Sequence, residues 1–290
     1  MSKPTLLVTG ASGNLGRRVL ELLLEANTGS KIIATTRNPD KLADLTARGV
    51  EVRAADFDDA ASLVKAFTGA DRALLVSTDA LDRREAQQTR AVQAFVEAGV
   101  KHVVYTSVPE PETTLALVGP SHAATERALA ATKLDYTALR NNLYADLLLG
   151  ALPGAVASGQ LVDARGDGRI AWVTREDCAR TAAAALVSAT GRSAIDVTGP
   201  AAIGSDELAA IVSDLVAKPV QHVNVTPEQL VAGLVGHGFP EFVAQLFATF
   251  DSATAKGQLA NATDTVEKLT GKKPQSIREF LAANRAALGA

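Results

Sequence analysis

The sequence has little cysteine and few aromatic residues: Cys178 is its one cysteine, and aromatic residues make up 4% of 290 positions. A single cysteine excludes an internal disulfide, so nothing points to an oxidising compartment. No apolar run approaches the roughly 20 residues that span a bilayer, and the N-terminal segment carries no signal-peptide pattern. The formal net charge of −3 gives no electrostatic reason to expect nucleic acid or an anionic membrane as partner. We therefore expect a cytoplasmic protein.

Several catalytic signatures are also missing. The sequence has no G-x-S-x-G, which argues against serine-hydrolase chemistry, and no G-K-[ST], which excludes a P-loop. No histidine has a second His or Cys at metal-ligand spacing, so no metal site is expected. Cys178 lies in an alanine-rich stretch and is expected to be a small buried residue, not a nucleophile.

The first half of the chain alternates short apolar runs with stretches of helical spacing. Ala91, Val92, Phe95 and Val96, for example, repeat as one helix face would. The expected strands are residues 5–9, 31–36, 50–54, 73–77, 102–106 and 135–139. This alternation predicts right-handed βαβ crossovers, and nearly all-apolar strands indicate a sheet covered on both faces. The expected fold class is α/β, a doubly wound parallel-sheet Rossmann fold.

The second half is less regular. Thr174-Arg-Glu-Asp177 resembles a capping box that opens an alanine-rich helix, residues 194–198 fit one more strand, and Thr226-Pro227 fits a helix start. We expect residues 1–150 to form the nucleotide-binding core. Residues 151–290 would form a smaller, mostly helical substrate-side lobe, with about 174–198 returning to the sheet.

Three glycines, Gly10, Gly13 and Gly16, stand between an apolar run and a helical stretch in "LLVTGASGNLGRRVLELLL". In a dinucleotide-binding turn, the first permits the turn, the second admits the pyrophosphate, and the third lets helix and strand pack closely. The helix N-terminus then offers free N–H groups to the anion. A glycine-rich turn without a ligand is the alternative, but this context favours a dinucleotide.

The second expected strand is followed by Arg37, where an NAD site usually has an acidic residue for the ribose hydroxyl. A guanidinium can instead bind a 2′-phosphate through two parallel hydrogen bonds. We therefore favour NADP(H), with Lys41 as a weaker second candidate for the same phosphate. A solvated loop cation is the alternative interpretation of Arg37.

These motifs together resemble a known family. The glycine turn, "TTRNPDKL", "AADFDD", "YTS" and "LRNNLY" are similar to the NmrA-like branch of the atypical short-chain dehydrogenases/reductases, and within it to quinone-reductase and triphenylmethane-reductase groups. The resemblance covers nearly the whole chain, including "GDG" and "VTRED" in residues 166–177.

The resemblance implies contacts along the length of the cofactor. It assigns Thr9, Gly10, Ser12, Gly13, Asn14 and Leu15 to the pyrophosphate, Arg37 and Lys41 to the 2′-phosphate, Asp56 and Phe57 to the adenine, Ser77 and Thr78 to the nicotinamide ribose, Thr106 and Ser107 to the nicotinamide, and Asn141, Asn142 and Tyr144 to the substrate. All these positions fall at strand ends, where ligands bind in open α/β sheets.

One departure bears on the chemistry. Active short-chain dehydrogenases usually carry Tyr-x-x-x-Lys after the fifth strand, and this chain has His122 and Glu126 at that spacing. His122 is a candidate hydrogen-bond donor or proton relay, and a nearby helix N-terminus should lower its pKa. A wall residue of the pocket is the alternative. Glu126 is expected to be a solvated carboxylate or an ion-pair partner.

Four phenylalanines gather in one segment: Phe239, Phe242, Phe247 and Phe250. On a helix starting near Pro240 they could wall a pocket for a flat acceptor, but core packing is the favoured interpretation. Tyr144 and Trp172 offer further aromatic faces.

The expected function is NADPH-dependent hydride transfer to a quinone or similar conjugated electrophile, because such an acceptor needs little acid catalysis. Two alternatives stay open: a reductase of cationic triarylmethane dyes or imines, and a non-catalytic, NADP(H)-sensing regulator. The expected partner is a small aromatic or quinone-like molecule, and the sequence is compatible with a homodimer.

Overall fold

The computed structural model describes residues 3–289, and the chain divides into two compact units. The first comprises residues 1–108, 120–140 and 178–196, and the second comprises residues 109–119, 141–177 and 197–290. The expected boundary near residue 150, between a nucleotide-binding core and a substrate-side lobe, remains a prediction. Each unit is described by itself below.

The first unit is built on a sheet of seven strands. Its strands are β1 (Leu6–Val8), β2 (Ile32–Thr36), β3 (Glu51–Ala54), β4 (Arg72–Leu75), β5 (His102–Ser107), β6 (Asp135–Asn141) and β9 (Arg192–Val197). They lie in the order β3-β2-β1-β4-β5-β6-β9, and neighbouring strands from β3 to β6 pair in parallel. The order reverses between β1 and β4, which confirms the doubly wound sheet and locates its switch point.

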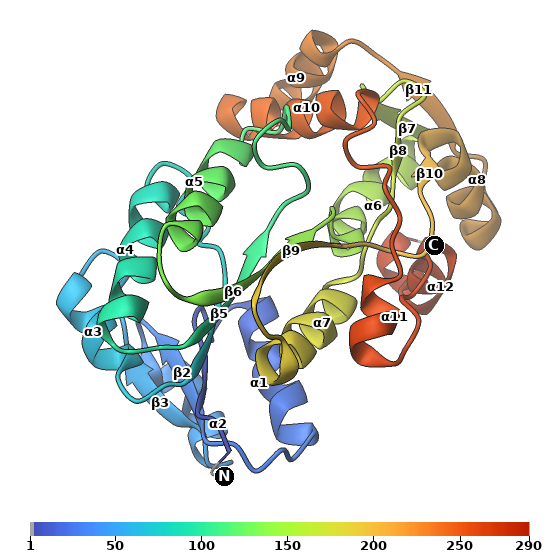
Figure 1. Ribbon diagram of the computed structural model, residues 1–290. Coiled ribbons are helices and arrows are strands. Elements are labelled where there is room, and N and C mark those ends of the chain that lie inside the picture. Colours follow the sequence, from blue (N-terminus) through green and yellow to red (C-terminus); the bar gives the residue numbers. More distant parts are fainter. Residues whose placement is uncertain (1–2, 290) are drawn as a thin grey trace. The chain divides into compact units, whose positions relative to one another are not determined.

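Helices cover this sheet on both faces, as its apolar strands predicted. They are α1 (Asn14–Glu25), α2 (Ala43–Thr46), α3 (Ala60–Phe67), α4 (Arg84–Glu97), α5 (Gly119–Ala130) and α7 (Arg175–Ser188), with a 3₁₀ turn η1 (Pro39–Leu42) before α2. In Figure 1, α3, α4 and α5 lie on one side of the sheet, and α1 and α7 lie on the other. A core on the first side joins Leu7, Ile33, Phe67, Phe95 and Tyr105, and Phe67 stacks on Phe95 with ring centroids 4.3 Å apart.

The second unit combines short sheets with helices (Figure 1). Its elements are η2 (Ala145–Leu147), α6 (Leu148–Ser158), β7 (Gln160–Asp163), β8 (Arg169–Ile170), β10 (Ile203–Gly204), α8 (Ser205–Val216), β11 (Gln221–Asn224), α9 (Pro227–Gly236), α10 (Glu241–Ala255), α11 (Thr265–Thr270), α12 (Ile277–Ala283) and η3 (Arg285–Leu288). β7 pairs with β11 in parallel, and β8 pairs with β10 antiparallel. Residues from α6, α8 and α12 share one core.

Two of the expected helix starts are confirmed by their caps. Thr226 and Gln229 form a capping box at α9, with Pro227 in the first turn. The Asp177 amide donates to the Thr174 hydroxyl over 3.0 Å, and this hydroxyl donates to the Asp177 carboxylate over 2.7 Å. These contacts satisfy amides that a helix start leaves without intrahelical partners.

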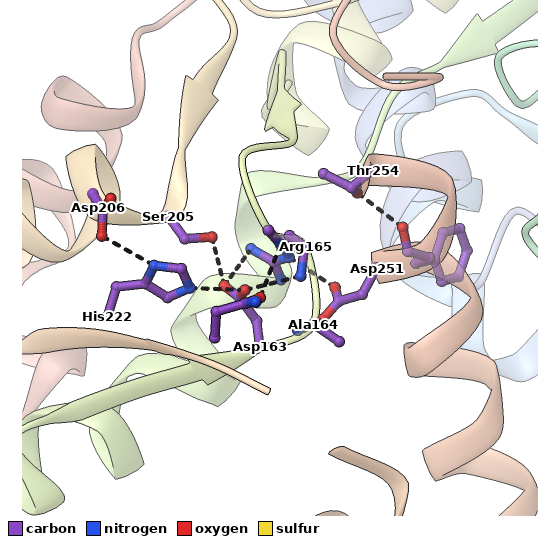
Figure 2. A network of polar contacts seen from close by, with 11 residues as sticks. Asp163, Ala164, Arg165, Ser205, Asp206, His222, Asp251 and Thr254 are labelled. Carbon is purple, nitrogen blue, oxygen red and sulfur yellow. Dashed lines mark hydrogen bonds and ion pairs between the residues drawn. The ribbon is translucent and has the colours of Figure 1, made fainter. Parts of the chain in front are cut away.

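A buried polar network joins four elements of the second unit (Figure 2). Asp163 at the end of β7 accepts from Ser205 at the start of α8, and over 3.0 Å from His222 on β11. Arg165 donates to Asp251 on α10 over 2.7 Å, and Asp251 also accepts from the Ala164 amide over 2.9 Å. Removing one partner of such a buried pair is strongly destabilising, so this network fixes α10 to the β7–β8 turn.

No helix within residues 3–289 is long and apolar enough to cross a membrane.

Candidate functional site

The turn after β1 has the geometry of an anion-binding loop. Gly10 has a φ of +59°, in the left-handed region that favours glycine, and its carbonyl accepts from the Gly13 amide over 3.0 Å. A Cβ on Gly16 would lie 2.5 Å from the Gly10 carbonyl oxygen, so glycine is required there. Gly13, the residue before α1, makes no side-chain cap, and the first turn of α1 has no acidic residue. The helix therefore begins with amides open to an anion.

At the switch point, a side-chain hydrogen bond joins the ends of two strands in addition to the sheet pairing. The Thr9 hydroxyl accepts from the Val76 amide over 3.0 Å, which ties the end of β1 to the end of β4. Asn14 is exposed and Leu15 buried, and these residues begin α1. Thr9 is thus a structural residue of the expected pyrophosphate loop, and its hydroxyl is already engaged.

Two cations follow β2 as the sequence suggested. Arg37 and Lys41 are both exposed, and no hydrogen bond or ion pair engages the Arg37 side chain within residues 3–289. Nearby, the hydroxyls of Ser12 and Thr36 lie 3.0 Å apart, linking the glycine loop to the end of β2. The end of β2 and the glycine loop therefore carry an unengaged guanidinium at Arg37 and two hydroxyls at Ser12 and Thr36, groups that suit a phosphate monoester.

The residues expected near the adenine follow β3. The Asp56 carboxylate accepts from the Asp58 amide over 2.9 Å, so this side chain shapes its own turn. Phe57 is half-buried, packs on the core of the first unit, and accepts at its carbonyl from Arg90 over 2.6 Å. Their contact with adenine stays a prediction.

Hydroxyls meet at the ends of β4 and β5. The Ser77 amide donates to the Thr106 hydroxyl over 2.9 Å. Ser107 donates its hydroxyl proton to Glu126 on α5 over 2.6 Å, and Arg140 on β6 pairs with the same carboxylate over 2.7 Å. Glu126 is therefore an ion-pair partner, one of the two roles expected for it, and the proton of Ser107 is already engaged.

His122 on α5 is 4% exposed, so it lies inside the first unit. Its Nδ1 lies 2.7 Å from the Tyr105 hydroxyl, and its Nε2 lies 3.4 Å from a guanidinium nitrogen of Arg84. Burial, reinforced by the Arg84 charge, lowers the pKa of His122 from 6.5 to about 3. The direction matches the expectation, but the cause is burial and a neighbouring cation instead of the helix N-terminus.

Two buried polar residues of α4 were not expected from the sequence. Gln88 is fully buried and Arg84 is 8% exposed, whereas Val96, expected on the apolar face, is 50% exposed. The signal was present, because Arg84 and Gln88 precede Ala91 and Phe95 at helical spacing and so share their buried face. Polar side chains on such a stripe indicate a buried hydrogen-bond network.

The second unit holds the expected substrate-facing residues. Asn141 at the end of β6 donates to the Tyr144 hydroxyl over 3.2 Å, and the Arg175 guanidinium lies 5.5 Å from the Tyr144 ring centroid. Asn142 donates to the Leu259 carbonyl over 2.9 Å and is a structural residue. Cys178 is buried, as expected, and Trp172 is 4% exposed within the core, where Arg165 covers its ring.

The favoured interpretation of the phenylalanine segment is wrong. Phe239, Phe242 and Phe247 are 43%, 55% and 40% exposed, and Phe239 meets Phe247 edge to face. Helix α10 instead buries small and polar residues, including Ala244 and Asp251. The periodicity showed which residues of α10 share a face. It did not show that the face with Asp251 would be buried, because Asp251 belongs to the network of Figure 2.

Two polar side-chain atoms at expected site positions test whether a cofactor fits. Thr78 Oγ1, just beyond β4, and Asn141 Oδ1 are buried without a hydrogen-bond partner within residues 3–289. Buried polar atoms are nearly always hydrogen-bonded. Thr78 Oγ1 and the uncapped start of α1, both in the first unit, suit a polar ligand, so these residues fit a dinucleotide. Asn141 Oδ1 offers a further polar atom in the second unit. No group of three or more His, Cys, Asp or Glu within the same range could hold a metal ion.

Buried histidines should make the stability of the first unit depend on pH. The pKa of His102 falls to about 4 and that of His122 to about 3, both mainly through burial. The unfolded chain binds these protons near pH 6.5, so stability should fall as the pH drops from about 6.5 towards 4, by up to about 1.4 kcal/mol per pH unit for each histidine. Urea unfolding at several pH values measures this slope.

The histidine prediction has a matched control. Replacing His102 by asparagine removes one titrating group, so we expect a shallower slope than in the unmodified protein. Exposed His237→Asn should leave the slope unchanged. A slope that is the same in all three proteins would contradict the prediction.

Comparisons with known proteins agree with this geometry. The sequence model described as the NmrA-like family matches residues 2–281. The chain is similar to quinone oxidoreductase 2 of Escherichia coli, with 34% identity covering 94% of this chain and 96% of that protein. It is also similar to the NAD(P)H azoreductase of Xenophilus azovorans, with 29% identity covering 98% and 99%.

Solved structures show the same fold over the same length. The E. coli quinone oxidoreductase QOR2 complexed with NADPH has a TM-score of 0.93 and 33% identity, covering 97% of this chain and all of that one. The Citrobacter sp. triphenylmethane reductase complexed with NADP(H) has a TM-score of 0.90 and 34% identity, covering 96% and 99%.

Proposed function

Because the chain belongs to the NmrA-like family, we propose that it is an NADPH-dependent oxidoreductase that transfers hydride to a quinone or similar conjugated acceptor. The cofactor supplies the hydride from its nicotinamide ring when bound. The loop of Gly10, Gly13 and Gly16 would hold the pyrophosphate, and Arg37 with Lys41 would hold the 2′-phosphate. The similarity to NADPH-bound quinone oxidoreductase and NADP(H)-bound triphenylmethane reductase supports this cofactor.

The state of His122 is the observation that carries the choice of acceptor. A ring with a pKa of about 3 is not an imidazolium near neutral pH, so it has no acidic proton to give. Ser107 already donates to Glu126 over 2.6 Å. Neither residue therefore has an available acidic proton for an alkoxide as it forms, which is what reduction of a simple ketone requires.

A quinone removes the need for an enzyme acid. One hydride added to a quinone gives a hydroquinone monoanion, whose charge is delocalised over the ring, and water supplies the one proton that completes the hydroquinone. The protein then acts mainly by holding the two reactants at about 3–3.5 Å in the reactive orientation. Tyr144, with its half-buried ring, is proposed to face the acceptor.

A cationic dye is the second candidate, since hydride neutralises a carbocation without any proton. The similarity to triphenylmethane reductase and the exposed phenylalanines of α10, which offer flat apolar surface, favour it. A sensor that binds NADP(H) without catalysis would account for the missing Tyr-x-x-x-Lys pair equally well.

An acceptor screen tests the proposal. Purified protein is mixed with NADPH and with 1,4-benzoquinone, cyclohexanone or a cationic triarylmethane dye, and NADPH absorbance is followed against a protein-free blank. We expect turnover of the quinone and a rate at least about 100-fold lower with cyclohexanone, because an absent general acid costs about that much. Efficient ketone reduction would refute the argument from His122. Dye bleaching without quinone turnover would favour the second candidate, and tight NADPH binding without any turnover would favour the sensor.

A further inference from the structure

We propose that Gln88 and Arg84 of α4 form a clamp on Thr78 that positions the nicotinamide half of the cofactor, and that His122 supports this clamp instead of acting as an acid. The inference rests on the proposed function, because it assumes that the segment after β4 carries the nicotinamide ribose. It assigns positioning roles to residues of α4 that the motifs alone did not single out.

Both backbone polar groups of Thr78 are held by one helix. Its amide donates to the Gln88 side-chain oxygen over 3.1 Å, and its carbonyl accepts from the Arg84 Nε over 2.6 Å. A residue held at both ends of its backbone has little freedom to turn. The backbone that carries the unpartnered Thr78 hydroxyl is therefore fixed in position.

The Gln88 side chain is itself held by two further hydrogen bonds. Its side-chain nitrogen donates to the Tyr105 hydroxyl over 3.0 Å and to the Thr125 hydroxyl over 2.7 Å. The amide orientation is decided by Thr78, because a backbone N–H can only donate and so requires the Gln88 oxygen. Tyr105 in turn contacts His122, which joins β5 and α5 to the support of the clamp.

Arg84 shows that the cluster does more than fill the core. Arg84 is 8% exposed, and within residues 3–289 no carboxylate forms an ion pair or hydrogen bond with it, although the charge of Asp79 acts on it from farther away. Burying an unpaired cation is costly, and an apolar residue of similar size would pack without that cost. The polar contacts that Arg84 makes lead to the Thr78 carbonyl and to His122, so its placement serves the loop after β4.

Ligands that report on separate halves of the cofactor test the clamp. Gln88→Leu removes the acceptor for the Thr78 amide while keeping the side chain's bulk. We expect its affinity for NADPH to fall about tenfold, as for loss of a buried hydrogen bond. Adenosine 2′,5′-bisphosphate lacks the nicotinamide half, so its affinity should stay within about twofold, since the clamp is proposed to act on the nicotinamide half alone. Calorimetric titration measures both.

The matched control is Gln93→Leu, which makes the same change at an exposed position of α4 and should leave both affinities unchanged. Gln88→Glu keeps an oxygen for the Thr78 amide but loses the two donations to Tyr105 and Thr125, so it should recover only part of the NADPH affinity. It also serves if the leucine variant does not fold. Equal loss of both ligands in Gln88→Leu, or unchanged NADPH binding, would overturn the clamp. Failure of the unmodified protein to bind NADPH would instead overturn the proposed function.

Discussion

Replacing Gly16 by valine is expected to weaken NADPH binding by up to about 100-fold, because overpacking at a fixed backbone contact costs up to about 3 kcal/mol. A Cβ at this position would meet the Gly10 carbonyl oxygen at 2.5 Å and its carbonyl carbon at 2.9 Å. Both atoms belong to the backbone of the turn, so no side chain can move aside. The start of α1 must shift away from β1, and the amides proposed to hold the pyrophosphate move with it.

A glycine elsewhere separates this effect from a general cost of valine. Gly233 lies inside α9, and a Cβ there meets no atom within 4 Å. Gly233→Val should therefore leave NADPH affinity unchanged, whereas Gly16→Ala should already weaken it, because alanine introduces the same Cβ. Fluorescence titration with NADPH measures the affinity, and thermal melting confirms that each variant is folded. Normal NADPH binding by folded Gly16→Val protein would show that the cofactor does not rest on this turn.

The sheet could be predicted from the sequence because the signals for its strands and turns lie within short segments of the chain. Each expected strand of the first half overlaps an observed one, and residues 194–198 overlap β9. Runs of apolar residues with almost no polar interruption occur where both faces of a strand are covered, and the glycines mark where β1 gives way to α1. The positions of Gly10, Gly16 and Arg37 at strand ends followed from this pattern alone.

The polar interior could not be predicted in the same way. Whether His122 is buried depends on Tyr105 and Arg84, which are distant in sequence and are brought together by the sheet and α4. The face of α10 that turns inward depends on Asp251 meeting Arg165 from another segment. Periodicity groups residues into faces, but long-range polar partners decide which face is buried.

Replacing Arg37 by alanine is expected to weaken NADPH binding about 10- to 100-fold while changing NADH binding little, because a charge-assisted hydrogen-bonded pair is worth about 1.5–3 kcal/mol. The two cofactors differ only in the 2′-phosphate, so their affinity ratio isolates what Arg37 contributes to that group. The exposed guanidinium has no partner of its own to lose within residues 3–289, so the change should not disturb the fold. Titration of each cofactor into the unmodified and variant proteins measures the ratio.

Arg48→Ala removes the same charge from an exposed position in the turn before β3 and serves as the matched control. If Arg37 acts through direct contact, the control keeps the preference for NADPH, whereas a general effect of net charge would lower it in both variants. Salt provides a second test, since an exposed contact with a phosphate is screened as the Debye length shrinks from about 10 Å at 0.1 M to about 3 Å at 1 M. The preference of the unmodified protein should therefore fall with added salt, while that of Arg37→Ala stays low throughout. Equal weakening of NADPH and NADH by Arg37→Ala would show that another residue holds the 2′-phosphate.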